Sequence, residues 1–289
     1  MKRYKPTSKS RRGMTTISFG DFITSNEPVK SLTHGFRRQM GRNHHGKVTT
    51  RHKGGGHKRL FREIDFTYNK VDVPYTIKSV EYDPNRSSRL AKVCYLENNV
   101  KKFYYILAPK NLQILDIVED STRKDIYYAL NNKNEITIAK KVGSCYYLHE
   151  FNVGDFIYNI ELIPQKGAQV VRSGGTSAIV LQKSLFFLTL KMPSGEHRLI
   201  STKCKAFYGN LSNDEHKHVI WRKAGKSRWL NIRPTVRGVA KNPIDHPHGG
   251  NTSGGCHPVT PWARLTKGKP TRSKKKINKL IIKTHKQKI

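Results

Sequence analysis

Residues 233–262, RPTVRGVAKNPIDHPHGGNTSGGCHPVTPW, cannot build a packed core of their own. They include five prolines, five glycines and three histidines, with Asp245 as the single acid, and their apolar residues follow no helix or strand period. Glycine lets a backbone approach its partner closely, and proline restricts the chain at low entropic cost. Such a segment is either disordered or takes its shape from whatever surrounds it.

The charge of the rest of the chain favours a polyanionic partner. The net charge is +35 at pH 7. Residues 1–60 carry 15 Lys and Arg against 2 acids, residues 61–216 carry 21 against 17, and residues 217–289 carry 19 against 1. A nearly balanced centre between two basic arms predicts a folded middle whose extensions are surrounded by phosphate.

Cysteine usage and hydropathy exclude two classes of protein. Cys94, Cys145, Cys204 and Cys256 are far apart and form no CxxC pair. This argues against a disulfide framework and fits a reducing compartment. No apolar run is long enough to span a membrane, and no secretory signal core is present. Residues 1–20 contain no acid and share the composition of a mitochondrial transit peptide.

A second Gly- and His-rich segment, GRNHHGKVTTRHKGGGHKRLFR, occupies residues 41–62. It has five glycines, four histidines and seven Lys or Arg residues, and no acid. It reads either as a solvated linker or as an arm threaded between nucleic-acid strands. In the second case Lys and Arg pair with phosphates, and the glycines at 54–56 admit close backbone approach. No GxxxxGK[ST] pattern supports a nucleotide-hydrolase loop.

Short strands are predicted between about 64 and 205, where segments rich in Val, Ile, Tyr, Phe and Leu alternate with turn signals. Many short strands at this spacing predict small β-barrels. The aromatic pairs at 104–105 and 186–187 are expected in cores rather than on base-stacking platforms. The expected strands are 73–82, 90–96, 102–107, 112–118, 155–162, 177–181, 184–191 and 197–201. The turn signals are Asp83-Pro84-Asn85, Asn98-Asn99, Gly154-Asp155 and Pro193-Ser194-Gly195.

Two other segments differ from the predicted strands in composition and patterning. Residues 119–142, EDSTRKDIYYALNNKNEITIAKKV, are charged, Asn-rich and weakly patterned. We expect a surface insertion between two barrels there, with a helical turn at 126–130. Residues 166–177, KGAQVVRSGGTS, form a second Gly-rich basic loop, which is either a tight connection between strands or a loop laid on phosphate.

The extension begins near residue 212 with SNDEHKHVIWRKAGKSRWLN. Ser212 followed by Glu215 matches a capping box and predicts a short helix starting there. Trp221 and Trp229 either stack on bases or Arg planes, or pin the extension back onto the second barrel. After residue 262 the chain is a basic tail without acids, for which we expect a strand or turn ordered against RNA rather than a disordered tail.

Donor side chains between 245 and 257 raise the alternatives of a metal site and of catalysis. The spacing supports zinc poorly, because the Cys-His pair is adjacent, no helix presents the groups on one face, and the HxE…PCxxC signature is absent. His246 titrates near neutrality, but no second carboxylate or nucleophile is fixed beside it. We therefore expect neither a metal nor a catalytic residue. The donors are Asp245, His246, His248, Cys256 and His257.

Several blocks of this sequence resemble the universal L2 family of large-subunit ribosomal proteins. They run in the family's order, cover almost the whole chain, and include a stretch as long as IDHPHGG, which is far more specific than a lone glycine loop. The block at 5–12 is similar to the mature N-terminus of bacterial members. The blocks are KPTSKSRR at 5–12, RHKGGGHKR at 51–59, EYDPNRS at 81–87, ILAPKNL at 106–112, KGAQVVRS at 166–173, RPTVRGVAKNPIDHPHGG at 233–250 and HPVTPW at 257–262.

The resemblance implies a mostly β fold, with an OB-like barrel followed by an SH3-like barrel between extended basic arms. It implies binding to large-subunit rRNA, help in subunit assembly and association, and a C-terminal extension directed toward the peptidyl-transferase centre, where RNA does the chemistry. The partners implied are rRNA, neighbouring ribosomal proteins and the small subunit. We divide the chain into a basic arm at 1–61, the first barrel at 62–147, the second barrel at 148–215 and an rRNA-binding region at 216–289.

The chain departs from the family pattern in two places. The loop after Gly250 is shorter than in typical bacterial members, and residues 120–138 look inserted. The TSGG before HPVTPW resembles alphaproteobacterial and mitochondrial members, and the chain is rich in Lys, Asn, Ile and Tyr, as an AT-rich organellar genome produces. We therefore expect a mitochondrial ribosomal protein, with a plastid or an AT-rich bacterium as the alternative.

The expected role is a structural rRNA-binding protein without enzymatic activity. No cofactor is expected, other than Mg²⁺ or K⁺ ions bridging to rRNA. The alternative is a free single-strand-binding protein built on an OB barrel, which predicts exposed aromatics on one barrel face. The expected rRNA contacts are Arg42, Arg51, His52, Lys53, Gly55, His57, Lys58, Arg59, Lys166, Arg172, Arg228, Trp229, Arg233, Arg237, Asn242, His246, His248 and Arg272.

Overall fold

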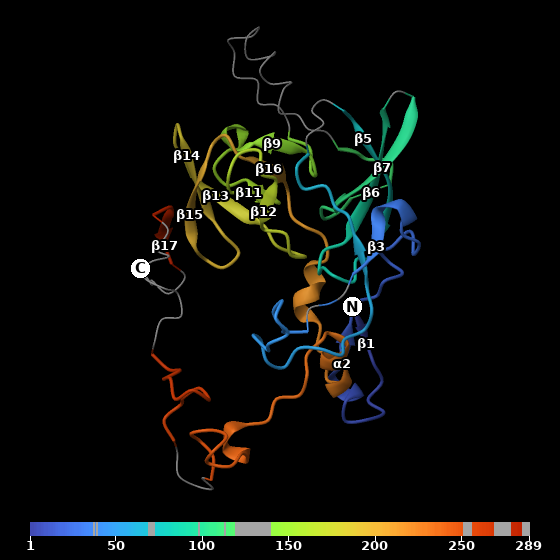
Figure 1. The fold of residues 1–289 in the computed structure, drawn as a ribbon. Coiled ribbons are helices and arrows are strands. Elements are labelled where there is room, and N and C mark those ends of the chain that lie inside the picture. Colours follow the sequence, from blue (N-terminus) through green and yellow to red (C-terminus); the bar gives the residue numbers. More distant parts are fainter. Residues whose placement is uncertain are drawn as a thin grey trace. The chain divides into compact units, whose positions relative to one another are not determined.

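The fold was obtained as a computed structural model of the chain (Figure 1). The structure describes residues 1–36, 38, 40–68, 73–97, 99–112, 114–118, 140–250, 256–268 and 279–284. The chain divides into two compact units. The first unit comprises Met1–Phe36, Arg59–Arg222 and Leu280–Ile289, and the second comprises Arg37–Lys58 and Lys223–Lys279.

The first unit contains two larger antiparallel sheets. The four-stranded sheet has the order β7-β6-β5-β8 and the seven-stranded sheet has the order β17-β15-β14-β13-β10-β16-β9. The strands of the first are β5 (Tyr75–Glu81), β6 (Leu90–Glu97), β7 (Val100–Leu107) and β8 (Ile117–Val118). Those of the second are β9 (Cys145–Tyr147), β10 (Phe156–Tyr158), β13 (Ala178–Lys183), β14 (Phe187–Lys191), β15 (His197–Ser201), β16 (Lys205–Tyr208) and β17 (Ile281–Lys283).

Smaller elements complete the first unit. Three two-stranded pairs are β1 (Lys2–Arg3) with β2 (Thr15–Thr16), β3 (Thr33–Gly35) with β4 (Leu60–Arg62), and β11 (Ile160–Glu161) with β12 (Ala168–Val170). The 3-10 helices are η1 (Arg11–Gly13), η2 (Lys30–Leu32), η3 (Leu148–Glu150) and η4 (Asp214–His218). The mostly β class is confirmed, and the two larger sheets are consistent with an OB-like and an SH3-like barrel.

Alternation of side chains explains why these segments form sheets. In β14, Leu188 and Leu190 are fully buried while Phe187 and Lys191 point outward, as expected for a strand with one face on a core. Apolar residues from both sheets belong to a single buried cluster, which runs from Tyr68 to Leu211. The two sheets therefore share one continuous core.

Turn residues end the strands where the sequence predicted. Glu97 pairs with Val100 across the β6–β7 hairpin, and Asn99 has φ +63°, a conformation that Asn tolerates well. The β14–β15 turn closes through the Gly195 amide, which donates to the Met192 carbonyl at 2.8 Å. At the turn Asp83-Pro84-Asn85, the Asp83 carboxylate accepts from the Asn85 backbone amide at 2.8 Å.

Some strand predictions need correction. The segment 112–118 keeps only β8, and 155–162 breaks at Asn159, whose φ of +50° separates β10 from β11. Residues 184–186 form a turn before β14 rather than its beginning. Strands β9, β12 and β16 were not predicted, because three- and four-residue strands give too little periodicity to recognise.

The aromatic pairs behave differently from one another. Tyr105 is fully buried and its hydroxyl donates to the buried Glu81 carboxylate at 2.7 Å, so the expectation of a core position is correct there. Phe186 and Phe187 are 74% and 40% exposed, so the same expectation is wrong for them. They lie at and just after the β13–β14 turn, where the chain has left the core.

The capping-box prediction at Ser212 is also wrong. The helix there is η4, its N-cap is Asn213 in the left-handed region, and no side chain caps it. The Ser212 hydroxyl instead accepts from the backbone amide of Arg89 at 3.2 Å. Ser212 thus ties the end of the second barrel to the start of β6.

Both ends of the first unit are ordered by the protein itself. The Thr15 hydroxyl donates to the His218 carbonyl at 2.9 Å, and the Thr24 hydroxyl accepts from the Val80 amide at 2.8 Å. Near the other end, β17 pairs with β15 through Arg198 and Ile281. The tail was expected to order against RNA, whereas this strand of it orders against the chain's own sheet. The predicted insertion at 120–138 lies outside the described residues.

Candidate nucleic-acid interface

The second unit is built by pairing two segments that are far apart in the sequence. The Gly54 amide donates to the Asn231 carbonyl at 3.1 Å, and the His57 amide donates to the Trp229 carbonyl at 3.1 Å. In return, the Arg233 amide donates to the His52 carbonyl at 3.0 Å. The segment 52–57 therefore runs beside the turn that follows α2 (Ala224–Trp229), although the described residues of this unit form no large sheet or core.

The glycines at 54–56 make this pairing possible. A Cβ at Gly56 would lie 2.8 Å from the Asn231 backbone nitrogen, and Gly55 has φ +68°. Gly56 also donates its amide to the Asn231 side-chain oxygen at 3.2 Å. The sequence predicted close backbone approach at these glycines, and the approach found here is to the chain's own extension.

Residues 41–50 form a tight loop within the same unit. The Thr49 and Thr50 amides both donate to the Gly41 carbonyl, and the Arg42 guanidinium donates to the Gly46 carbonyl at 2.7 Å. The ring centroids of His44 and His45 lie 3.8 Å apart at the exposed end of this loop. The loop is thus shaped by its own backbone and keeps its basic side chains outward.

Residues 237–250 fold into a compact cluster of turns. The Gly249 amide donates to the His246 carbonyl at 2.8 Å, and the Gly250 amide donates to the Lys241 carbonyl at 3.2 Å. The His246 ring is the buried centre of this cluster, since a Cβ at Gly238 would lie 2.6 Å from its Cε1 atom. The 3-10 helix η5 (Gly238–Ala240) covers the ring. The Gly/Pro/His segment therefore has a definite local fold without an apolar core.

Histidine chemistry supports this turn cluster. Burial, followed by the charges of His248, Lys241 and Arg51, lowers the pKa of His246 below its ordinary value. The ring is therefore neutral at pH 7, and its Nδ1 atom accepts from the His248 amide at 3.0 Å. The Nε2 atom of His248 lies 2.9 Å from the His257 carbonyl oxygen and 3.2 Å from the Val259 amide nitrogen. The two rings join the cluster to the hairpin at 257–266.

Most predicted rRNA contacts are accessible to a partner. The buried exception is His246, and Arg272 lies outside the described residues. The exposed positions are Arg42, Arg51, Lys53, Gly55, His57, Lys58, Lys166, Trp229, Arg233, Arg237 and Asn242. The half-buried positions are His52, Arg59, Arg172, Arg228 and His248. All described contacts except Arg59, Lys166 and Arg172 belong to the second unit.

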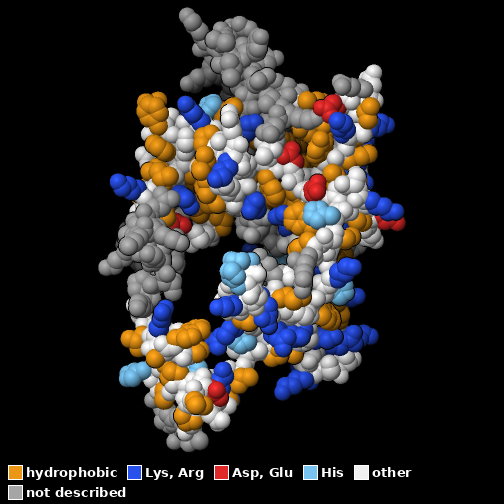
Figure 2. All heavy atoms as spheres, in the orientation of Figure 1, with side chains coloured by type: hydrophobic (Ala, Val, Ile, Leu, Met, Phe, Trp, Pro, Cys, Tyr) orange, Lys and Arg blue, Asp and Glu red, His pale blue; other side chains and the backbone are white. Residues whose placement is uncertain are grey.

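Stacking orients several of these cations. The Arg51 guanidinium lies over the Trp262 ring at 5.1 Å, and the Lys223 ammonium lies over the Trp229 ring at 5.1 Å. Trp229 is 52% exposed and Trp262 is 69% exposed, so each ring keeps much of its surface available. Figure 2 shows many more blue Lys and Arg side chains than red acidic side chains on the visible face.

A second basic site lies wholly within the first unit. The blocks at 81–87 and 166–173 meet around a hollow of about 420 Å³. The guanidinium groups of Arg86 and Arg172 lie 5.1 and 4.7 Å from the centroid of the Phe66 ring. Residues lining the hollow are Asn85, Arg86, Ser87, Gln169, Val171, Arg172 and Ser173. Two guanidinium groups beside serine and amide side chains make an anion-binding arrangement.

Backbone strain marks the same hollow. Val171 has φ +55° and is 8% exposed, a conformation that costs a β-branched residue on the order of 1–3 kcal/mol. A neighbouring segment stabilises this strained conformation, since the Val171 carbonyl accepts a hydrogen bond from the Asn159 amide at 2.9 Å. Burial lowers the pKa of Arg86, and the Arg172 charge lowers it further, against the opposing effect of Asp83. Arg86 is already paired with Asp83, whose carboxylate oxygen lies 3.3 Å from the Arg86 Nε atom.

Of the two arginines that line this hollow, Arg172 is among the contacts predicted from the sequence and Arg86 is not. Arg86 lies within the EYDPNRS block, so the signal was present. What the sequence did not reveal is that this turn faces the loop at 166–173. That pairing depends on Ser87, whose hydroxyl accepts from the Gly174 amide at 2.9 Å.

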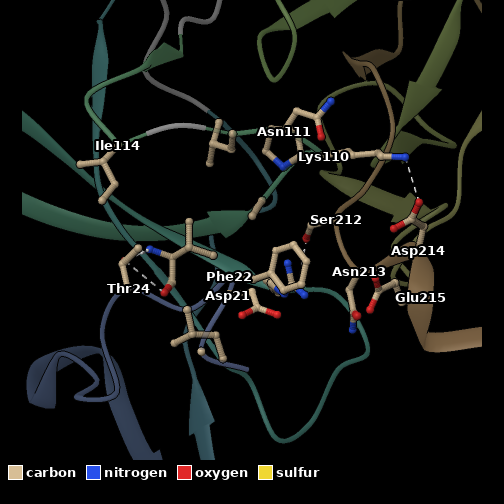
Figure 3. A pocket seen from close by; sticks show the side chains of 17 residues that line it. Asp21, Phe22, Thr24, Lys110, Asn111, Ile114, Ser212, Asn213, Asp214 and Glu215 are labelled. Atoms are coloured by element: carbon tan, nitrogen blue, oxygen red, sulfur yellow. Dashed lines mark hydrogen bonds and ion pairs between the residues drawn. The ribbon is translucent and has the colours of Figure 1, made fainter. Parts of the chain in front are cut away.

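A pocket of about 350 Å³ lies elsewhere in the first unit and is used internally (Figure 3). Residues 20–24 of the N-terminal arm line it together with the start of η4. The Arg89 guanidinium lies 3.9 Å from the Phe22 ring centroid, and the Lys110 ammonium donates to Asp214 at 2.8 Å. Both cations therefore have partners within the pocket. These contacts connect the N-terminal arm, the four-stranded sheet and η4.

Metal sites and membrane-spanning helices were sought in the residue ranges that the structure describes. Within those ranges, no group of three or more His, Cys, Asp or Glu side chains is placed to hold a metal ion. Nor does any helix in the described part of the chain have the length and apolar character needed to cross a membrane.

Two protein-family models match the sequence of this chain. Residues 29–119 match the sequence model described as "Ribosomal Proteins L2, RNA binding N-terminal domain", and residues 141–263 match "Ribosomal Proteins L2, C-terminal domain". The chain belongs to the ribosomal protein L2 family. This L2-family chain is 42% identical over 291 residues to "Large ribosomal subunit protein uL2" of Parvibaculum lavamentivorans, an alignment covering 100% of this chain and 98% of the relative.

The two family matches leave a short stretch of the chain unmatched between them. The first match ends at residue 119 and the second begins at residue 141. The unmatched residues between them include 120–138, where the sequence predicted an insertion. The hollow around Arg86 and Arg172 contains one block from each matched domain, so the two domains of the family contribute jointly to it.

Proposed function

We propose that this L2-family protein is a structural constituent of the large ribosomal subunit and binds rRNA at two basic surfaces. The first is the exposed face of the second unit, and the second is the Arg86–Arg172 hollow. The observation that carries the proposal is the backbone pairing of 52–57 with 229–233. This pairing uses protein partners for the main chain and leaves Lys53, His57 and Arg233 exposed for phosphates.

The proposed contacts recognise shape more than base sequence. Lysine and arginine side chains on a narrow, core-free framework can follow RNA grooves that a compact domain cannot enter. We include in the proposal a role in subunit assembly and in association with the small subunit, and an extension that reaches toward the peptidyl-transferase centre. Neighbouring ribosomal proteins are further proposed partners.

The proposal assigns no catalytic step to the protein. His246 supports the turn cluster through its Nδ1 atom, which is a structural use of the ring. Large subunits assembled with His246→Asn, which keeps an acceptor near this position, should therefore form peptide bonds at the wild-type rate. A loss of peptidyl transfer in fully assembled subunits would contradict the assignment.

Salt-dependent fractionation tests the ribosomal proposal directly. The full chain should co-migrate with the large subunit in sucrose gradients and resist moderate salt, with mass spectrometry identifying the fraction. Arg233→Ala with Arg237→Ala should deplete the chain from subunits, because both guanidinium groups are exposed on the second unit. The matched control is Lys78→Ala with Lys101→Ala, two exposed cations of the four-stranded sheet. A chain at the top of the gradient would favour a free single-strand-binding protein.

The Arg86–Arg172 hollow has its own test. Arg172→Ala should weaken rRNA binding by a similar factor for different RNA sequences and should reduce the salt slope by about 1, as expected for one lost phosphate contact. Arg198→Ala, at a partly exposed position on β15, serves as a control of the same residue type. Equal effects of the two substitutions would remove the hollow from the interface.

We also propose that the ribosome concerned is mitochondrial and that the four-part division at 61, 147 and 215 describes how the protein is organised on rRNA. The composition rich in Lys, Asn, Ile and Tyr supports the first point. Proteomics of ribosomes from purified mitochondria should recover the chain. Recovery only from plastid or cytoplasmic ribosomes would overturn this assignment and leave rRNA binding intact.

A further inference from the structure

The turn between β13 and β14 presents apolar side chains where turn chemistry selects polar ones. The Ser184 amide donates to the Phe187 carbonyl at 3.0 Å, which leaves Leu185 and Phe186 as the two residues of the loop. Loops of this length favour Gly, Asn and Asp. Leu185 is 88% exposed and Phe186 is 74% exposed, so neither residue is there to fill the protein's own core.

The backbone of this turn is held in place. Thr202 is 8% exposed, and its amide donates to the Phe186 carbonyl at 3.0 Å. Its hydroxyl lies 3.3 Å from the carbonyl oxygens of both Leu185 and Phe186. The Thr202 carbonyl in turn accepts from the His149 amide at 3.2 Å, which connects the turn to η3. The loop is therefore a supported projection, and recognition by it falls to the side chains.

The chemistry around this projection differs from that of the RNA-facing segments. Its four exposed apolar residues are Leu181, Leu185, Phe186 and Phe187. The leucines have no aromatic face for stacking on bases, and the turn contains no Arg, Gly or Pro, the residues that dominate the second unit. Exposed cations do flank it, namely Lys183 and Lys203. Figure 2 shows orange hydrophobic side chains at the upper left, over the start of β14.

We propose that residues 181–187, with Lys203, form a docking projection for a neighbouring protein of the same ribosomal subunit. Leu185 and Phe186 enter an apolar socket on that protein, and Lys183 and Lys203 pair with acidic side chains at its rim. The proposal rests on the ribosomal function, because the partner is a protein of the large subunit. It adds a protein contact on the second barrel to the RNA contacts proposed above.

A photo-crosslinker at the tip identifies the occupant. The full chain carrying p-benzoylphenylalanine in place of Phe186 is assembled into large subunits and irradiated. The expected adduct joins position 186 to one ribosomal protein, within an apolar pocket bordered by Asp or Glu. An adduct with rRNA, an adduct with a second copy of this chain, or no adduct would each overturn the proposal.

Matched substitutions test the energetics of the contact. Phe186→Ser should lower retention of the crosslinked protein in salt-washed subunits by about 10-fold or more, as for an interface hot spot. Lys183→Glu with Lys203→Glu should also lower retention, because the rim charges then repel. The control is Leu96→Ser, at a position 64% exposed on the β6–β7 hairpin, which should leave retention unchanged. Unchanged retention in the Phe186 variant would refute the proposal.

The same subunits separate this inference from the ribosomal function. Phe186 is exposed, so Phe186→Ser should leave the thermal midpoint and the co-migration of this chain with the subunit unchanged. If the chain itself leaves the subunit in every variant and in the wild type, the ribosomal function fails. If the chain stays and the neighbour stays with it, only the docking proposal fails.

Discussion

Gly56 allows two distant segments to pair closely because it has no side chain. Its amide bonds to Asn231, 175 positions away, and its Cα hydrogen occupies space that a methyl group cannot enter. A glycine-rich sequence suggests flexibility or contact with RNA, because the partner that requires the glycine is not visible locally. The glycines at 54–56 were recognised from the sequence, and the reason for them was not.

We expect Gly56→Ala to destabilise the second unit by about 1–3 kcal/mol through overpacking against the Asn231 backbone. Amide exchange at Gly54 and His57, whose amides bond to this segment, should speed up about 10-fold or more. Gly225→Ala is the control, because a Cβ there meets no atom within 4 Å, and alanine favours the helix α2. Equal exchange in both variants would show that the pairing tolerates the methyl group.

His246 makes the turn cluster sensitive to acid. Its pKa is lowered in the folded protein, so the unfolded chain takes up a proton first as pH falls. The stabilisation is complete above the ordinary pKa of about 6.5 and is lost progressively as pH falls below it. The protection factor against amide exchange at Gly249 should therefore fall between pH 7 and pH 5.

The variant His246→Asn should remove this pH dependence, while His44→Asn, at an exposed ring, should keep it. The comparison uses the difference between each variant and the wild type, so that other histidines cancel. Parallel profiles for wild type and His246→Asn would mean that another group controls the acid response. His246 was singled out from the sequence as an RNA contact, whereas its burial favours a supporting role.

At the scale of elements, long alternating strands were predictable and short ones were not. The β6–β7 hairpin and β15 follow directly from apolar runs bounded by Asn or Gly turns. Strands β9 and β16 are short, and they are defined by each other through the register of Lys205 with Tyr147. Such pairing is tertiary information. The turn at 184–186 was assigned to a strand because Leu185 and Phe186 are apolar, although both side chains are exposed.

Strand β17 provides an element-scale prediction. The Leu199 amide donates to the Leu280 carbonyl at 2.8 Å, and Arg198 is in register with Ile281. Ile281→Pro removes a backbone donor and should detach the strand, at a cost of about 1 kcal/mol for a lost hydrogen bond. Faster amide exchange at Leu199 reports this detachment. Ile282→Ala, at a position 57% exposed, is the control, and unchanged exchange in the proline variant would contradict the assignment.

For the whole molecule, charge is divided less sharply between the two units than between the arms and the centre of the sequence, since the second unit carries 21 Lys and Arg against 1 acid and the first carries 34 against 19. The sequence predicted two basic arms, and the structure assigns residues 1–36 to the same unit as the barrels. The segments that pair to form the second unit come from both arms. This combination could not be predicted, because nothing in the sequence of 41–58 specifies 228–233 as its partner.

We expect rRNA affinity of the full chain to fall by about 10³-fold or more between 50 and 200 mM salt, as for proteins that neutralise many phosphates. Replacing Lys53, Arg233 and Arg237 with Gln should reduce the slope of log affinity against log salt by about 2–3. Replacing Lys78, Lys101 and Lys191, equally exposed but in the barrel sheets, should change it little. Equal changes in the two triple variants would contradict a special role of the second unit in binding rRNA.

The pairing of β17 with β15 has a topological consequence. Residues 37–58 and 223–279 are internal stretches, each flanked on both sides by residues of the first unit. With β17 paired to β15, the residues that follow the second stretch are anchored in the sheet of the first unit. This three-residue strand therefore sets whether the stretch is anchored at one end or at both.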